Sequence, residues 1–120
     1  MKAWVITVAL AGALVSSGVM ADGTQLLMEC QAAIRVMDNL EVEGVKAGVC
    51  IGTIQSVEEM VAMLGKDVPK DMAICLPTNG ANGGQAIRIV TKYLENNPKQ
   101  LHFPSALLTS MALSDAFPCN

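Results

Sequence analysis

Aromatic and basic side chains are the scarcest classes in this 120-residue chain. Aromatic residues make up 3% of it, and 8 Lys and Arg stand against 11 Asp and Glu, for a net charge of −3. Nucleic acids and anionic lipid surfaces select clusters of Lys and Arg, and the basic residues here are dispersed. We therefore expect a mildly acidic protein that binds neither nucleic acid nor an anionic membrane surface.

Histidine is almost missing, since His102 is the single one. This excludes a multi-histidine metal site, and no two cysteines have the close C-x2-C spacing of structural zinc. His102 stands next to Phe103 at the start of a predicted helix, where it is best interpreted as a capping or packing residue. The adjacent Glu58 and Glu59 point in different directions around a helix and are interpreted as a solvated face. The sequence thus lacks a catalytic constellation and predicts no enzyme, no metal and no other cofactor.

The N-terminus has the order of a secretory signal peptide. A lysine precedes the apolar run Ala3–Val15, and a stretch of small residues then leads to Ala21. A transmembrane anchor is the alternative, but a run of about a dozen residues falls short of the roughly 20 that span a bilayer. We predict that residues 1–21 are a signal peptide cleaved before Asp22. Residues 22–120 then form one exported domain with no membrane segment after cleavage.

Apolar residues recur at three- and four-residue steps in four stretches, the spacing of amphipathic helices. The predicted helices are Thr24–Asn39, Ala47–Leu64, Gln85–Asn97 and Pro104–Ala116. Thr24 is the predicted cap of the first helix, Asn82 with Gln85 forms a capping box before the third, and Gly65 is placed to end the second in the left-handed conformation. No stretch shows strand alternation. The sequence predicts an all-α fold, a small disulfide-stapled bundle of four main helices with short connections.

The apolar stripe of each helix predicts the core. In the first two helices it consists of Leu27, Cys30, Ile34, Met37, Cys50, Ile54, Val57, Val61 and Leu64. In the last two it consists of Ala86, Ile87, Val90, Tyr93, Leu94, Phe103, Leu107, Leu108, Met111 and Ala112. Most of the 8 methionines are interpreted as core filler. Met60 and Met63 have the alternative of forming a soft contact surface.

Four cysteines lie in the predicted exported domain, and an even number in a small secreted chain indicates disulfides. Cys75 precedes the third helix and Cys119 follows the fourth, so an antiparallel pair of these helices would bring the two cysteines together. By exclusion, Cys30 pairs with Cys50. On a chain-entropy argument, each bond contributes on the order of 3–4 kcal/mol to stability. The predicted pairs are therefore Cys30–Cys50 and Cys75–Cys119.

The stretch Thr78–Gly84 is predicted from its composition to be the most flexible of the chain. Glycine-rich turns before helices also bind phosphates, but this one lacks the Lys and Ser/Thr of a P-loop and a preceding strand. It is either a mobile start to the third helix or an exposed loop that inserts into the cleft of a partner. On the second interpretation, the partner-binding candidates are Thr78, Asn79, Gly80, Ala81 and Asn82.

Four short motifs follow one another along the predicted domain. They are Cys-Ile-Gly at 50–52, Cys-Leu-Pro at 75–77, Tyr-Leu at 93–94 and Phe-Pro-Cys at 117–119. In this order they resemble the Rap/Tai family of immunity proteins, the periplasmic antidotes to the amidase effectors of type VI secretion systems. The resemblance covers residues from about Leu26 to Cys119.

The resemblance implies an all-helical, disulfide-bearing periplasmic protein of a Gram-negative bacterium, often a homodimer. Such proteins bind a peptidoglycan amidase delivered by a neighbouring cell and occlude its active site, with no chemistry of their own. Thr53 stands where the family usually has an aromatic residue, and the Gly-rich start of the third helix offers little side-chain surface to a target. The alternative is a small periplasmic stress or envelope protein, an HdeA-like chaperone with no effector partner.

Overall fold

The computed structural model describes residues 21–39, 44–77 and 81–119. Four α-helices carry the fold: α2 (Gly23–Met37), α3 (Gly44–Leu64), α4 (Gly83–Asn96) and α5 (Ser105–Ala116). Short 3-10 turns connect them at η3 (Gly65–Asp67), η4 (Lys70–Met72) and η5 (Pro98–Gln100). Over the described ranges, pairing of extended backbone is limited to an isolated bridge between Asp22 and Pro104. The predicted all-α architecture of four main helices is confirmed.

Side-chain caps explain where α2 and α4 begin. The Asp22 carboxylate accepts the N–H of Gln25 at 3.1 Å, and the Asn82 side-chain oxygen accepts the N–H of Gln85 at 2.7 Å. Each cap satisfies a first-turn N–H that has no acceptor within the helix. The predicted cap at Asn82 is confirmed. The predicted cap at Thr24 is wrong, because Asp22 takes that role two residues earlier.

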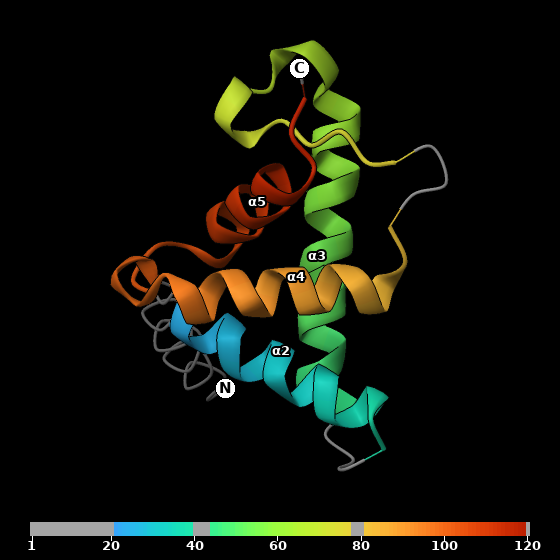
Figure 1. Ribbon diagram of the computed structural model, residues 1–120, viewed down its shortest axis with the longest axis vertical. Helices are drawn as coiled ribbons and strands as arrows, with labels where there is room; N and C mark the ends of the chain where they lie inside the picture. The colour runs from blue at the N-terminus through green and yellow to red at the C-terminus, as the bar shows by residue number, and fades with distance from the viewer. Residues whose placement is uncertain (1–20, 40–43, 78–80, 120) are drawn as a thin grey trace, which may run out of the picture.

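Residues 65–77, which follow α3, contain two short 3-10 turns. Gly65 follows α3 with a φ of +54°, the left-handed conformation predicted for it. The turns η3 and η4 then lead to the stretch of residues 73–77, which begins in an extended conformation at Ala73. Figure 1 shows this stretch crossing the upper part of α3 close to the C-terminus.

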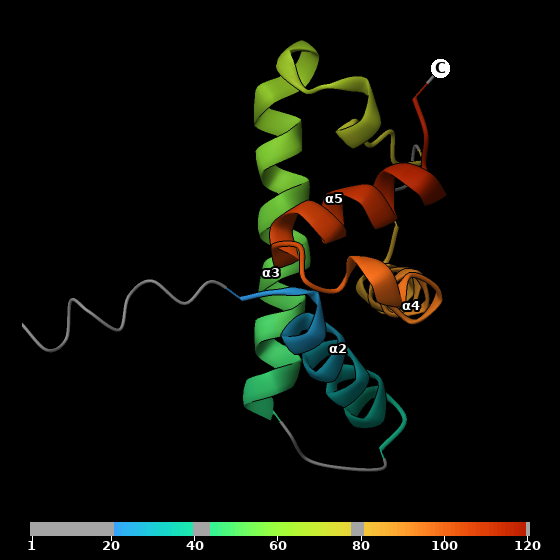
Figure 2. The same ribbon diagram turned by 90° about the vertical axis from the view of Figure 1, so that its left-hand side faces the viewer.

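Three helices pack on one side of α3, which stands as the long axis of the molecule (Figures 1 and 2). Figure 2 shows α2, α4 and α5 stacked on that side, with α4 seen end-on and α5 lying across the view. The predicted antiparallel arrangement of α4 and α5 is therefore wrong, since the two helices cross steeply. α3 is consequently covered along one stripe, whose buried members are Ala47, Cys50, Ile54 and Val57.

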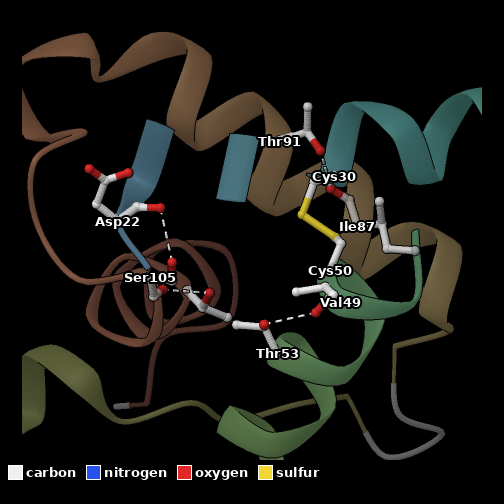
Figure 3. The surroundings of a disulfide bond; sticks show 9 residues. Asp22, Cys30, Val49, Cys50, Thr53, Ile87, Thr91 and Ser105 are labelled. Carbon is white, nitrogen blue, oxygen red and sulfur yellow. Dashed lines mark hydrogen bonds between the residues drawn. A yellow bond between two sulfur atoms is a disulfide. The ribbon is translucent and has the colours of Figure 1, made fainter. Parts of the chain in front are cut away.

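The core lies where α2, α3 and α4 meet. Its completely buried side chains include Leu26, Cys30, Cys50, Val90 and Leu94. Figure 3 shows the Cys30–Cys50 disulfide joining α2 to α3 beside α4. Two other side chains of the core are Leu108 and Leu113 of α5. Leu113 was absent from the predicted core.

Two residues predicted to be buried are exposed. The side chain of Met37 is 36% exposed and that of Leu64 is 47% exposed. Both lie at the last residue of a helix, α2 and α3 respectively. The helical period persists in the sequence up to that residue, but a side chain in the last turn has packed neighbours on fewer sides than one in the middle of the helix.

Both predicted disulfides are present, but the reason given for the second needs correction. Each has a Cα–Cα distance of 5.1 Å. Cys75–Cys119 does not close an antiparallel hairpin. It ties the stretch after η4 to the tail after α5, and the N–H of Cys75 donates to the carbonyl oxygen of Phe117 at 2.9 Å. Both cysteines of the Cys75–Cys119 disulfide are exposed, whereas Cys30 and Cys50 are 0% exposed.

Candidate functional site

Of the five predicted partner-binding residues, only Ala81 and Asn82 belong to the described ranges. Thr78, Asn79 and Gly80 lie outside the described residues. Ala81 is half-buried and Asn82 is exposed, but the side-chain oxygen of Asn82 is occupied as the cap of α4. Contact of these residues with a partner therefore stays a prediction.

The candidate chemical groups are dispersed. Exposed His102 packs edge-on against Phe103, with ring centroids 4.5 Å apart, as expected of a packing residue. All four cysteines are disulfide-bonded. In the three described ranges, no group of three His, Cys, Asp or Glu side chains is placed to hold a metal ion. Two concave parts of the surface, a groove and a pocket, are the candidate binding sites instead, and both are lined by α3.

The first is an apolar groove of about 710 Å³ between α3, α5 and η4. It exists because α5 crosses α3 steeply, so that the two helices diverge and leave a wedge between them. The described residues that line it carry no charge: Val49, Gly52, Thr53, Ser56, Val57, Met60, Val61, Leu64, Val68, Pro69, Met72, Ala106, Leu107 and Ser110. One of them is Thr53, which stands where the family that the sequence resembles usually has an aromatic residue. The small side chain there leaves space in the groove.

Exposed apolar side chains continue beyond this groove on the uncovered side of α3. Of the nine exposed large hydrophobic residues in the described ranges, six belong to α3: Val45, Val49, Ile51, Met60, Met63 and Leu64. Val45 is 84% and Met63 is 82% exposed, so these side chains contribute nothing to the core. Val49, Met60 and Leu64 also line the groove, so that exposed apolar side chains adjoin it, and apolar surface of this kind is a feature of interaction sites. We call the groove and these residues together the α3 face.

The α3 face also explains a second property of the helix. Gly44–Asp67 is long and apolar enough to cross a membrane, since an 18-residue window within it has a mean hydropathy of 1.2, with 22% of that window buried. Yet three helices pack along one side of it, and Cys50 is bonded to Cys30 of α2. The apolar residues on its other side are those of the α3 face. The interpretation of most methionines as core filler is wrong, since none of the six methionines in the described ranges is buried. Met60 and Met63, at 55% and 82% exposed, agree with the alternative of a contact surface. Val45, Val49 and Ile51 lie outside the predicted core stripe of this helix, and that was the signal for them in the sequence.

The second feature is a pocket of about 330 Å³ beside the Cys75–Cys119 disulfide. Glu58 of α3 lines it, and burial raises the pKa of this carboxyl above its ordinary value near 4.5. Its Oε1 atom is enclosed and accepts no hydrogen bond from the described residues. The expectation that Glu58 and Glu59 form one solvated face is therefore wrong for Glu58, although Glu59 is exposed. The two residues point apart, and only the first lines the pocket.

The motif residues mostly hold the fold. Cys50 and Leu94 are 0% exposed, and Phe117 accepts the Cys75 hydrogen bond. Tyr93 is half-buried, and its hydroxyl donates to the Gln100 side chain at 3.0 Å. Burial, and to a lesser degree the negative charge of Asp115, raise the pKa of Tyr93. These residues hold the scaffold, and three motif residues, Cys75, Leu76 and Cys119, also line the Glu58 pocket.

Comparison with known proteins identifies that scaffold. No curated protein and no solved structure shows significant similarity to the chain. The family model of the Rap1a immunity proteins matches residues 22–119, a span that contains all four helices and both disulfides. The chain therefore belongs to the Rap1a immunity protein family.

Proposed function

We propose that this protein is a periplasmic immunity protein that binds a type VI secretion peptidoglycan amidase and occludes its active site. Membership of an immunity family supports the role of an inhibitor directed against an effector. The predicted signal peptide and the two disulfides support the periplasm, an oxidising compartment that also contains the peptidoglycan. The observation that carries the proposal is the α3 face, since a large uncharged surface serves association better than catalysis.

Occlusion requires an extended contact. Inhibitory complexes of ordinary size bury about 1,600 Å² in total, or roughly 800 Å² on each partner. The groove of about 710 Å³ supplies a concave centre for an anchor side chain of the effector. Met60, Met63 and Leu64 border or flank it and are 55%, 82% and 47% exposed. Their flexible or branched apolar side chains adapt to a partner surface and release water from it.

The test is binding of oxidised residues 22–120 to a panel of Cys–His peptidoglycan amidases. We expect stoichiometric inhibition of at least one of them, and protection of cells that express this amidase in the periplasm. Met63→Lys should weaken binding by about tenfold or more, because it places a charge in the apolar contact. Gln55→Lys is the matched control, since Gln55 is an exposed polar residue of α3 outside the groove. Absence of binding across the whole panel would contradict the proposal.

The resemblance to the Rap/Tai family also implies homodimers. A second copy of the chain is therefore the alternative occupant of the α3 face. Light scattering of the purified protein distinguishes the cases. A dimer disrupted by Met63→Lys would assign the face to self-association and move the effector contact elsewhere.

The HdeA-like chaperone is a second candidate, because exposed apolar surface such as Val45 and Met63 also captures unfolded chains. It predicts suppression of aggregation of unrelated proteins at low pH, without stoichiometric amidase inhibition. An immunity protein shows the opposite pair of results.

A further inference from the structure

The pocket beside Cys75–Cys119 differs from the α3 groove in having a charge at its wall. It lies between α3 and the stretch Ala73–Leu76, with Cys119 of the C-terminal tail at its edge. Glu58 is the one charged side chain among the described residues that line it. The other lining residues are apolar, glycine or disulfide-bonded.

We propose that this pocket receives a basic side chain, Lys or Arg, of the bound partner; the identity of that partner as an effector rests on the proposed function. The assignment starts from the Oε1 atom of Glu58, which is enclosed and accepts no hydrogen bond within the described part of the chain. Because Oε1 is shut off from solvent without a donor, the charged carboxylate is poorly stabilised in the free protein. The Oε2 atom is not enclosed in this way, and a cationic donor that reaches it offsets that penalty. Burial raises the pKa of the Glu58 carboxyl, in agreement with an environment that opposes its charge in the free protein.

The walls of the pocket suit the stem of such a side chain. Val61, Ile74 and Leu76 present apolar surface, which packs against the methylene groups of Lys or Arg while the charged head reaches the carboxylate. A volume of about 330 Å³ lies at the small end of the range of roughly 300–1,000 Å³ for ligand pockets, a size suited to one side chain. The described residues offer no three-ligand cluster here, which argues for an organic cation over a metal ion.

The charge of the whole chain acts in the same direction. Its net charge of −3 attracts a partner with a basic surface and accelerates their encounter. Glu58 adds a defined position at which one positive charge of that surface is desolvated and bonded. The α3 groove supplies apolar contact area and the pocket supplies the orientation of the complex.

The pocket depends on the exposed disulfide. Cys75 and Cys119 both line it, and the hydrogen bond from Cys75 to Phe117 fixes the same stretch of chain to the tail. Opening Cys75–Cys119 frees the outer wall, while the buried Cys30–Cys50 bond still holds α2 to α3. Loss of the pocket is thus separable from loss of the fold.

The first test uses no effector. N-acetyl-arginine amide is titrated into the oxidised protein, and N-acetyl-citrulline amide serves as a neutral probe of nearly the same shape. We expect saturable NMR shifts of the Ala62, Ala73 and Ile74 amides with the arginine probe at millimolar concentration. The shifts should be absent with citrulline, absent in Glu58→Gln and in Cys75→Ser/Cys119→Ser, and retained in Glu59→Gln, whose residue is exposed. Equal shifts with both probes, or shifts unchanged in Glu58→Gln, would overturn the proposal.

The second test uses whichever amidase binds in the panel described above. Glu58→Gln should weaken that complex by about tenfold or more, and Glu59→Gln should leave it unchanged. A tight complex with equal affinity for wild type and Glu58→Gln overturns the pocket assignment and leaves the immunity function intact. If no amidase binds, the immunity function fails and the arginine titration still decides whether the pocket takes a basic side chain.

Discussion

Gly23 lies directly against the backbone of Leu101. A Cβ atom on Gly23 would come within 2.9 Å of both the Cα and the carbonyl oxygen of Leu101, and would also collide with the Leu108 side chain. The backbones are held together there, since Gly23 donates to the Phe103 carbonyl at 3.0 Å and Thr24 donates to that of Leu101 at 3.2 Å. Glycine at the start of α2 is therefore required by the turn between α4 and α5.

Gly23→Ala should lower the free energy of unfolding by about 1–3 kcal/mol, because backbone atoms have to move to admit the methyl group. Gly48→Ala is the matched control, with nothing within 4 Å of its added Cβ atom. That change should stabilise α3 by up to about 1 kcal/mol through helix propensity. Urea denaturation of both variants measures the difference. A Gly23→Ala protein as stable as wild type would contradict the close packing.

The two disulfides should be reduced in a fixed order. Cys75 and Cys119 are exposed, whereas Cys30 and Cys50 are 0% exposed, so a thiolate reaches only the first pair in the folded protein. Mild reduction followed by alkylation and peptide mass spectrometry should label Cys75 and Cys119 first. Labelling of Cys30 should appear only with unfolding, which circular dichroism records in the same samples. Simultaneous labelling of both pairs in folded protein would refute this order.

Glu58 should make stability depend on pH. Burial raises its pKa above the ordinary value near 4.5, so the folded state holds this proton to higher pH than the unfolded state does. Stability is then lost as the pH rises from about 4.5 through the raised pKa. Glu58→Gln removes this titration, so it should be more stable than wild type at about pH 7 and lose that advantage at about pH 4.

Thermal melts of wild type and Glu58→Gln across this pH interval measure the effect. Glu59→Gln, on the exposed side of the same helix turn, is the control for removal of a negative charge. A stability difference between Glu58→Gln and wild type that stays constant with pH would show that the carboxyl is not desolvated.

The ion pair between Asp38 and Arg88 should contribute little. Its N–O distance is 3.0 Å and it links the end of α2 to α4, but the side chains of Arg88 and Asp38 are 53% and 45% exposed. Exposed pairs of this kind contribute roughly 0.2–1 kcal/mol and are screened by salt. A double-mutant cycle with Asp38→Asn and Arg88→Gln gives the coupling energy. A coupling well above this range, or one insensitive to salt, would be the contrary result.

Processing before Asp22 should leave the fold intact. Ser105 donates its N–H to the Ala21 carbonyl at 3.0 Å and its hydroxyl to the Asp22 carbonyl at 2.9 Å, the second contact being drawn in Figure 3. Cleavage removes the first bond and keeps the second, together with the Asp22 cap of α2. Intact mass spectrometry of the exported protein should show a chain that begins at Asp22. Detection of the full-length chain alone in the periplasm would contradict the predicted signal peptide.

Local features were predictable because they depend on a few neighbouring residues. Asn82 caps α4 through an N–H three residues away, and Gly65 adopts a backbone conformation that other residues rarely enter. The pairing of the cysteines was also predicted, although the antiparallel helices used to argue for Cys75–Cys119 are not present. The predicted pairing is nevertheless correct, because four cysteines can pair in only a few ways. The crossing of α4 and α5 was not predictable in the same way, because it depends on side chains from several helices at once.

The sequence by itself determined an all-helical chain with two disulfides and the motif order of an immunity family, because helix periodicity, caps and motifs are properties of short segments. Only the tertiary structure decided that three helices pack on one side of α3, which leaves its other apolar residues exposed. It likewise separated Glu58 from Glu59, since only Glu58 lines a pocket together with the stretch Ala73–Leu76. The spacing of apolar or acidic residues along a helix is the same whether another segment of the chain or a partner covers them. Only the contacts between distant segments therefore distinguish the core from an interface.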